Sequence, residues 1–141
     1  MESTGCGGLN SLMARTNISS GSRYEPLIGF SRAVRVGDRV LVSGTAPIWP
    51  DGQVDPDPAT QARRCLEIIL DALYQAGARA SDVVRTRCFL TDGSYSEAVG
   101  RAHGEVFGTV LPASTMVVVA GLLDERWKVE IEAEAIVTDP V

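Results

Sequence analysis

The side chains that could do acid–base chemistry lie near the C-terminus. Glu130, Glu132 and Glu134 alternate with apolar residues, and a carboxyl group can hold a water or move a proton once burial raises its pKa. Their spacing alone favours three solvated carboxylates on one face of a strand. The chain has a single histidine, His103, so no Ser-His-Asp arrangement is apparent. Any acid–base chemistry of this chain is therefore expected to depend on these carboxyl groups.

The cysteines do not indicate a metal site. The three residues, Cys6, Cys65 and Cys88, form no CxxC motif, and with one histidine they leave no structural zinc site. Cys65 and Cys88 occupy apolar positions of a predicted helix and a predicted strand, which indicates core packing. We expect no metal and no cofactor, and thiols in a reducing, cytoplasmic location.

Composition and charge exclude several function classes. The 141 residues are 45% hydrophobic and 22% charged, which is typical of one globular domain and not of a disordered chain, a collagen or a coiled coil. The longest apolar run, Met116–Leu123, is far shorter than the roughly twenty residues of a membrane helix. The net charge of −5 disfavours nucleic-acid binding. We expect neither a membrane nor a nucleic acid as partner.

The first 22 residues have the composition of a flexible tail. Gly, Ser, Thr and Asn dominate residues 1–22, and the apolar residues there have no period that could bury a face. Residues 1–12 precede Met13, a second candidate start. We therefore predict a flexible tail over 1–22 and a single domain over 23–141.

Local signals predict the first elements of the domain. Ser31–Val36 and Arg39–Ser43 flank Gly37-Asp38, which predicts a hairpin with a type II′ turn. Asp57 and Pro58 suit the N-cap and first position of a helix. Gly77 suits its C-terminal end.

The second half supplies another helix and three strands. A strand is predicted over Val83–Thr91, and Ser94–Glu97 has the capping-box pattern of a helix that closes at Gly108. Met116–Ala120 and Trp127–Val137 are the last predicted strands. The order β-β-α-β-α-β-β predicts an α+β fold, one mixed sheet with two helices on one face. The other face is half apolar, which favours an oligomer.

Five segments occur in an order and spacing that resemble the Rid family, also called the YjgF family. They are Ser43–Pro47, Gln61–Gly77, Asp82–Asp92, Phe107 followed by Pro112–Thr115, and Val129–Ala133. The best-known members of this family are reactive-imine deaminases, and the resemblance covers residues 17–137. It implies a YjgF-like, chorismate-mutase-like fold and a barrel-like homotrimer with small-molecule pockets between neighbouring subunits.

The resemblance also implies roles for individual residues. In the deaminases, an Arg after Pro-Ala grips the substrate carboxylate, a Glu of the last strand positions a water, a Ser-Gly pair lines the pocket and a Tyr closes it. The Glu corresponds to Glu130, the implied catalytic residue. The implied substrate-binding positions are Phe30 at the Tyr position, Ser43, Gly44, Ser114 at the Arg position, and Met116 two residues later.

The function implied is hydrolysis of an imine or enamine, with Glu130 holding the water. Ser114 offers no cation, so the resemblance implies poor activity on simple 2-imino acids; Arg32, Arg35, Arg85 and Arg87 lie on predicted strands and leave open another clamp. The alternative is a non-catalytic trimer that binds small ligands or acts like a chaperone. RNA cleavage, attributed to some family members, is disfavoured by the net charge of −5 and the single histidine.

Overall fold

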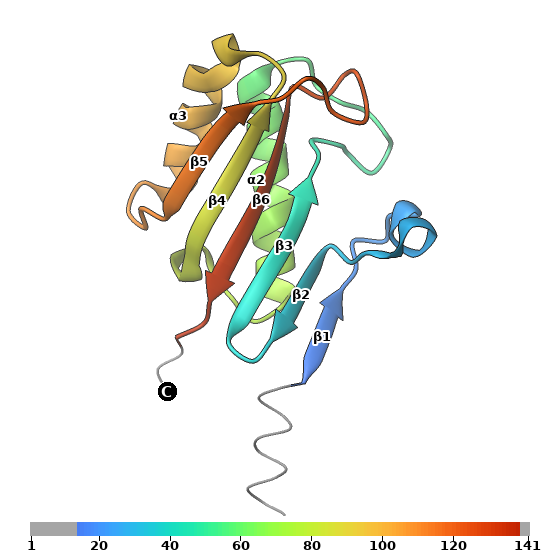
Figure 1. The fold of residues 1–141 in the computed structure, drawn as a ribbon, viewed down its shortest axis with the longest axis vertical. Helices are drawn as coiled ribbons and strands as arrows, with labels where there is room; N and C mark the ends of the chain where they lie inside the picture. The colour runs from blue at the N-terminus through green and yellow to red at the C-terminus, as the bar shows by residue number, and fades with distance from the viewer. Residues whose placement is uncertain (1–13, 139–141) are drawn as a thin grey trace, which may run out of the picture.

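The computed structural model describes residues 14–138 as one six-stranded sheet with two α-helices on the same side (Figure 1). The strand order is β1-β2-β3-β6-β4-β5, and only β4 and β5 are parallel among the strand pairs of residues 14–138. The predicted α+β architecture is confirmed. The strands are β1 (Arg15–Ile18), β2 (Ala33–Val36), β3 (Arg39–Thr45), β4 (Val83–Leu90), β5 (Ala113–Val118) and β6 (Val129–Ile136). The helices are α2 (Pro58–Gln75) and α3 (Ser96–Phe107), with short helical turns η1 (Glu25–Gly29), η2 (Ala80–Asp82) and η3 (Gly93–Tyr95).

Helix α2 begins and ends where its local sequence requires. The Asp57 side chain accepts a hydrogen bond from the Thr60 backbone N–H at 2.9 Å, and Pro58 occupies the first turn, where a missing N–H costs nothing. Gly77 follows with a φ of +84°, a conformation that favours glycine. The buried side of the helix includes Leu66 and Ile69, so the helix is anchored on the sheet by an apolar stripe.

The hairpin forms as predicted and leads into an irregularity of β3. Gly37 has a φ of +61° and Asp38 is not among the residues of positive φ, as a type II′ turn requires. Strand β3 then pairs with β6, and the register shifts between Val42 and Thr45. This irregularity, a bulge at Ser43 and Gly44, is a feature that commonly re-aims side chains beside a functional site.

The predicted tail is wrong for residues 15–18. They form β1, which pairs antiparallel with β2 from Arg15↔Val36 to Ile18↔Ala33. Ile18 is only 8% exposed, and its carbonyl accepts the Arg32 backbone N–H at 2.9 Å. Four residues are too few to show a periodic pattern of apolar residues, so the sequence did not indicate this strand. Its pairing with β2, which is distant in the sequence, stabilises it. Residues 1–12 lie outside the described part of the chain.

The start of α3 also differs from the prediction. The Asp92 side chain accepts the Ser94 backbone N–H at 2.8 Å and caps the short turn η3. Helix α3 then begins at Ser96, and no side-chain capping bond forms at Tyr95. The capping box predicted from Ser94 and Glu97 is therefore wrong, because the Asp92 carboxylate caps the chain two residues earlier.

Strand β5 begins three residues before the predicted Met116. It pairs in parallel with β4 from Arg85↔Ala113 to Leu90↔Val118, so Ser114 lies inside the strand. The turn before it holds Leu111 at a φ of +56°, the left-handed region that non-glycine residues rarely adopt. The polar residues Ser114 and Thr115 weaken the apolar signal of this edge strand, and pairing with β4 extends it beyond that signal.

The sheet has one covered and one open face. The residues of β6 alternate as predicted, with Val129, Ile131, Ala133 and Ala135 buried and the intervening glutamates on the other side. On that open face Arg87 pairs with Glu132 at 3.2 Å. A groove of about 470 Å³ crosses it, and Leu41 beside this groove is 47% exposed. No helix within residues 14–138 is long and apolar enough to cross a membrane.

Candidate active site

Glu130 lies on β6 opposite the bulge of β3. A Cβ added to Gly44 would fall inside contact distance of Oε2 of Glu130, so the carboxylate occupies space that only a glycine leaves free. Burial raises the pKa of Glu130, the charge of Arg32 lowers it, and the charge of Glu132 raises it, with a net rise. The bulge thus provides a half-buried carboxyl group with a pKa above its ordinary value, as acid–base chemistry requires.

Arg32 is the cation whose charge lowers the pKa of Glu130. Its Nη2 donates to the Gly44 carbonyl at 2.7 Å, its guanidinium lies 5.7 Å from the centre of the Phe30 ring, and its buried Nε has no hydrogen-bond partner among residues 14–138. Burial lowers the pKa of Arg32, and the charges of Glu25 and Glu130 oppose that shift. Arginine nevertheless remains protonated. We call Phe30, Arg32, Gly44 and Glu130 the Glu130 cluster.

The other candidate arginines are engaged elsewhere. Arg35 donates to the Ala76 carbonyl at 2.8 Å, at the end of α2. Arg85 and Arg87 form the ion pairs of the open face with Glu134 and Glu132. Among these four arginines, Arg32 is the one that donates a hydrogen bond to a residue of the predicted site, the backbone carbonyl of Gly44.

Ser43 and Phe30 line an open hollow of about 570 Å³ beside the Glu130 cluster. The Ser43 hydroxyl donates to the Ser31 carbonyl at 2.7 Å, which fixes the bulge to the segment before β2. Glu25 lines the same hollow and is only 5% exposed. Burial opposes ionisation of Glu25, but hydrogen bonds from Ser20 and its neighbour lower its pKa overall. Sequence reasoning missed Glu25, because no local pattern marks a carboxylate that its own loop encloses.

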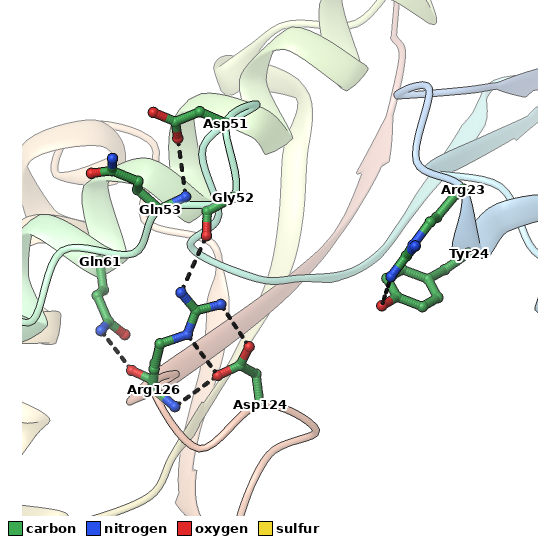
Figure 2. Close-up of polar contacts among 8 residues, drawn as sticks. All are labelled: Arg23, Tyr24, Asp51, Gly52, Gln53, Gln61, Asp124 and Arg126. Carbon is green, nitrogen blue, oxygen red and sulfur yellow. Dashed lines mark hydrogen bonds and ion pairs between the residues drawn. The ribbon is translucent and has the colours of Figure 1, made fainter.

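The loops at this end of the sheet are tied together by Gln61. Its buried side-chain amide donates to the Arg126 carbonyl at 3.0 Å and accepts the Lys128 backbone N–H at 2.7 Å. The Arg126 side chain in turn binds Asp124 at 2.8 Å and the Gly52 carbonyl at 3.2 Å (Figure 2). These contacts fix Lys128, which directly precedes β6 and lies two residues before Glu130.

Ser114 and Met116 lie away from the Glu130 cluster. Both are on β5, and β4 separates this strand from β6. Met116 pairs with Cys88 and packs against the core. Ser114 contacts the Thr86 hydroxyl at 2.8 Å. A single chain therefore brings together Phe30, Gly44, Glu130 and the adjoining Ser43 but not the two predicted residues of β5.

The other titratable groups do not form a metal-binding cluster within residues 14–138. No group of three or more His, Cys, Asp or Glu side chains there could hold a metal ion. Cys65 and Cys88 are free and buried, as their apolar positions predicted. Burial raises the pKa of Cys88 to about 11, which keeps it a thiol at neutral pH.

Comparison with known proteins agrees with this fold. The family model described as Endoribonuclease L-PSP matches residues 20–137. A crystal structure of a member of the YjgF/YER057c/UK114 family from Mycobacterium tuberculosis is 45% identical, covers 87% of this chain and 99% of its own, and gives a TM-score of 0.81. The chain therefore belongs to this family, the YjgF or Rid family.

Two further relatives show how varied the family is. An uncharacterized protein of Streptomyces coelicolor is 40% identical over 119 residues, which are 84% of this chain and 89% of the relative. The 2-iminobutanoate/2-iminopropanoate deaminase of Escherichia coli is 32% identical over 111 residues, 76% of this chain and 86% of the relative. The family thus includes deaminases as well as proteins without an assigned reaction.

Proposed function

We propose that this protein is a homotrimer that hydrolyses an imine or enamine in pockets between neighbouring copies, with Glu130 holding the attacking water. The observation that carries the proposal is the half-buried Glu130 carboxyl, packed against Gly44 beside Arg32. The relation to a 2-iminobutanoate/2-iminopropanoate deaminase supports the reaction type.

The chemistry needs one base and one water. The Glu130 carboxylate accepts a proton as the water oxygen bonds to the imine carbon, and the raised pKa makes it a stronger base. The carbon–nitrogen bond then breaks, the nitrogen leaves as ammonia after taking up protons, and a carbonyl group remains. An enamine enters the same route after a proton is added to its β-carbon.

Oligomerisation is the step that would complete the pocket. Ser114 and Met116 belong to β5 at one edge of the sheet, whereas Phe30 precedes β2 near the other. Residues at opposite edges of a protomer meet when copies associate head to tail around a symmetry axis, so that one edge of each copy lies against the other edge of the next. The exposed Leu41 and the groove of the open face support burial against other copies.

The substrate is expected to differ from a simple 2-imino acid. A charge-assisted hydrogen bond to a substrate carboxylate contributes about 1.5–3 kcal/mol. Ser114 carries no positive charge and cannot donate such a bond. Hydrolysis of 2-aminoacrylate should therefore be accelerated weakly at most. Non-catalytic ligand binding is the alternative function. RNA cleavage, which the name of the family model suggests, is disfavoured by the net charge of −5.

The test compares Glu130→Gln with the matched variant Glu132→Gln. Imines without a carboxylate are generated in situ from a panel of primary amines with an amine oxidase, and ammonia release is followed. We expect the wild type and Glu132→Gln to accelerate hydrolysis of at least one imine, and Glu130→Gln to lose about 10²-fold or more. A fully active Glu130→Gln trimer would remove Glu130 from the mechanism. A wild type that accelerates no imine would leave ligand binding as the function.

A further inference from the structure

Thr86, His103 and Ser114 form a hydrogen-bonded chain across three elements. The Thr86 hydroxyl, on β4, lies 2.8 Å from Nε2 of His103 on α3 and 2.8 Å from the hydroxyl of Ser114 on β5. Thr86 is 0% exposed, whereas Ser114 is exposed. The hydrogen bonds therefore lead from the half-buried imidazole of His103, through the buried hydroxyl of Thr86, to the Ser114 hydroxyl, which a ligand can reach. We call these three residues the Ser114 chain.

The proton count of Thr86 restricts this chain to two states. A threonine hydroxyl has one proton, so Thr86 must donate to one neighbour and accept from the other. In the first state His103 donates from Nε2, Thr86 donates to Ser114, and the Ser114 proton points outward. In the second state Ser114 donates to Thr86, Thr86 donates to Nε2, and Ser114 offers only lone pairs to a ligand.

The three side chains of the Ser114 chain are uncharged at neutral pH. Burial lowers the pKa of His103 below its ordinary value, and the imidazole packs on the Phe107 ring with centroids 4.8 Å apart. The arginines that flank Thr86 on β4 point to the other side of the sheet, where Arg85 and Arg87 pair with glutamates. No cation thus assists Ser114 from β4, and a carboxylate has no charged partner on this strand.

We propose that the Ser114 chain recognises an uncharged carbonyl oxygen of the ligand, such as that of an amide, and that the His103 tautomer sets whether Ser114 donates to it. A carbonyl oxygen is an acceptor, so its binding selects the state in which Nε2 carries the proton. The inference rests on the proposed function for placing Ser114 in the ligand pocket. The inference adds the chemical class of the ligand group that Ser114 binds, an uncharged carbonyl.

The experiment uses the full chain labelled with ¹⁵N in its one histidine, whose two ring nitrogens report the tautomer by NMR. Pyruvamide and pyruvate are titrated in parallel, because they share a skeleton and differ in one charge. We expect pyruvamide to shift the His103 tautomer toward Nε2–H, and pyruvate to bind at least about tenfold more weakly. Thr86→Val, which removes the hydroxyl at similar volume, should abolish the His103 response.

Two further variants keep the inference falsifiable if Thr86→Val does not fold. Thr86→Ser retains the hydroxyl and should restore the response, and Ser114→Ala, at an exposed position, should remove the preference for pyruvamide. Tighter binding of pyruvate, a response that survives in Thr86→Val or Ser114→Ala, or failure of pyruvamide to affect His103 would each overturn the inference. The readout needs no turnover, so a protein that hydrolyses no imine but shows the expected response would overturn only the proposed reaction.

Discussion

The Glu130 cluster and the Ser114 chain solve opposite physical problems in one sheet. The Glu130 cluster holds two charged groups, a carboxyl and a guanidinium, against a glycine backbone at a bulge of β3. The Ser114 chain holds an imidazole and two hydroxyls on the helix-covered side of β4 and at the edge strand. We propose that the Glu130 cluster supplies charge for chemistry and that the Ser114 chain supplies neutral hydrogen bonds for recognition.

The difference shows that Ser114, although it carries no charge, belongs to a hydrogen-bonded network with Thr86 and His103. A buried hydroxyl with two partners is fully satisfied, so the Ser114 chain costs the fold little. The Glu130 cluster keeps a buried Arg32 Nε unpartnered and disfavours the charge of Glu130, which costs stability. Functional strain is thus concentrated at the Glu130 cluster.

The largest expected effect comes from filling the space beneath Glu130. In Gly44→Ala the new Cβ displaces the Glu130 carboxyl, because the carboxyl is the flexible end of the contact. We expect imine hydrolysis to fall about 10²-fold, with little change in melting temperature. Gly104→Ala, where a Cβ meets nothing within 4 Å, is the control and should retain activity. Equal activities in the two variants would contradict the placement of the carboxyl.

The next effect tests what supports the Glu130 cluster from the N-terminal side. Ile18 is buried, and its carbonyl accepts the Arg32 backbone N–H. Ile18→Ala should lower the free energy of unfolding by about 2 kcal/mol, measured by urea denaturation. Leu123→Ala, at a side chain 93% exposed, should change it by less than about 0.5 kcal/mol. A similar small loss for both would mean that β1 does not stabilise the domain.

Deleting residues 1–12 tests the rest of the predicted tail. We expect this deletion to leave β1 in place and the melting temperature within a few degrees of the full chain. Loss of the oligomer on deletion would show instead that residues 1–12 dock on another copy.

The smallest effect is a pH-dependent gain in stability. The folded-state pKa of Glu130 is raised, so ionisation of this group is harder in the folded than in the unfolded chain. This lowers the free energy of unfolding at pH values above the raised pKa. The loss disappears as the pH falls below the ordinary pKa of a glutamate. Glu130→Gln should therefore melt higher than the wild type at pH 7 and nearly equally at pH 4. A lower melting temperature at pH 7 would show that the carboxylate stabilises the fold.

Local chemistry was enough to predict some elements but not others. Asp57, Pro58 and Gly77 define α2 through bonds within a few residues, and the alternation of β6 follows from one buried face. Strand β1 was not predicted, because its pairing with β2 is non-local. Ser94 was a plausible cap by pattern, and only the geometry of Asp92 decided between the two.

The same limit applies to the site. Glu130 was identified through family resemblance, since spacing alone favoured a solvated carboxylate. Arg32 could not be chosen among four arginines, because the sequence does not give the bulge that brings Gly44 to it. The Ser114 chain joins residues from β4, α3 and β5, and it exists only once β4 and β5 pair in parallel.

We propose that the Glu130 cluster and the Ser114 chain form one complete pocket only between copies of the protein. The most direct test is the mass of the full-length protein in solution, measured by light scattering at micromolar concentration. We expect about three times the chain mass of 15.0 kDa. A stable monomer of 15.0 kDa would contradict it, because the two regions would then remain on separate parts of one sheet.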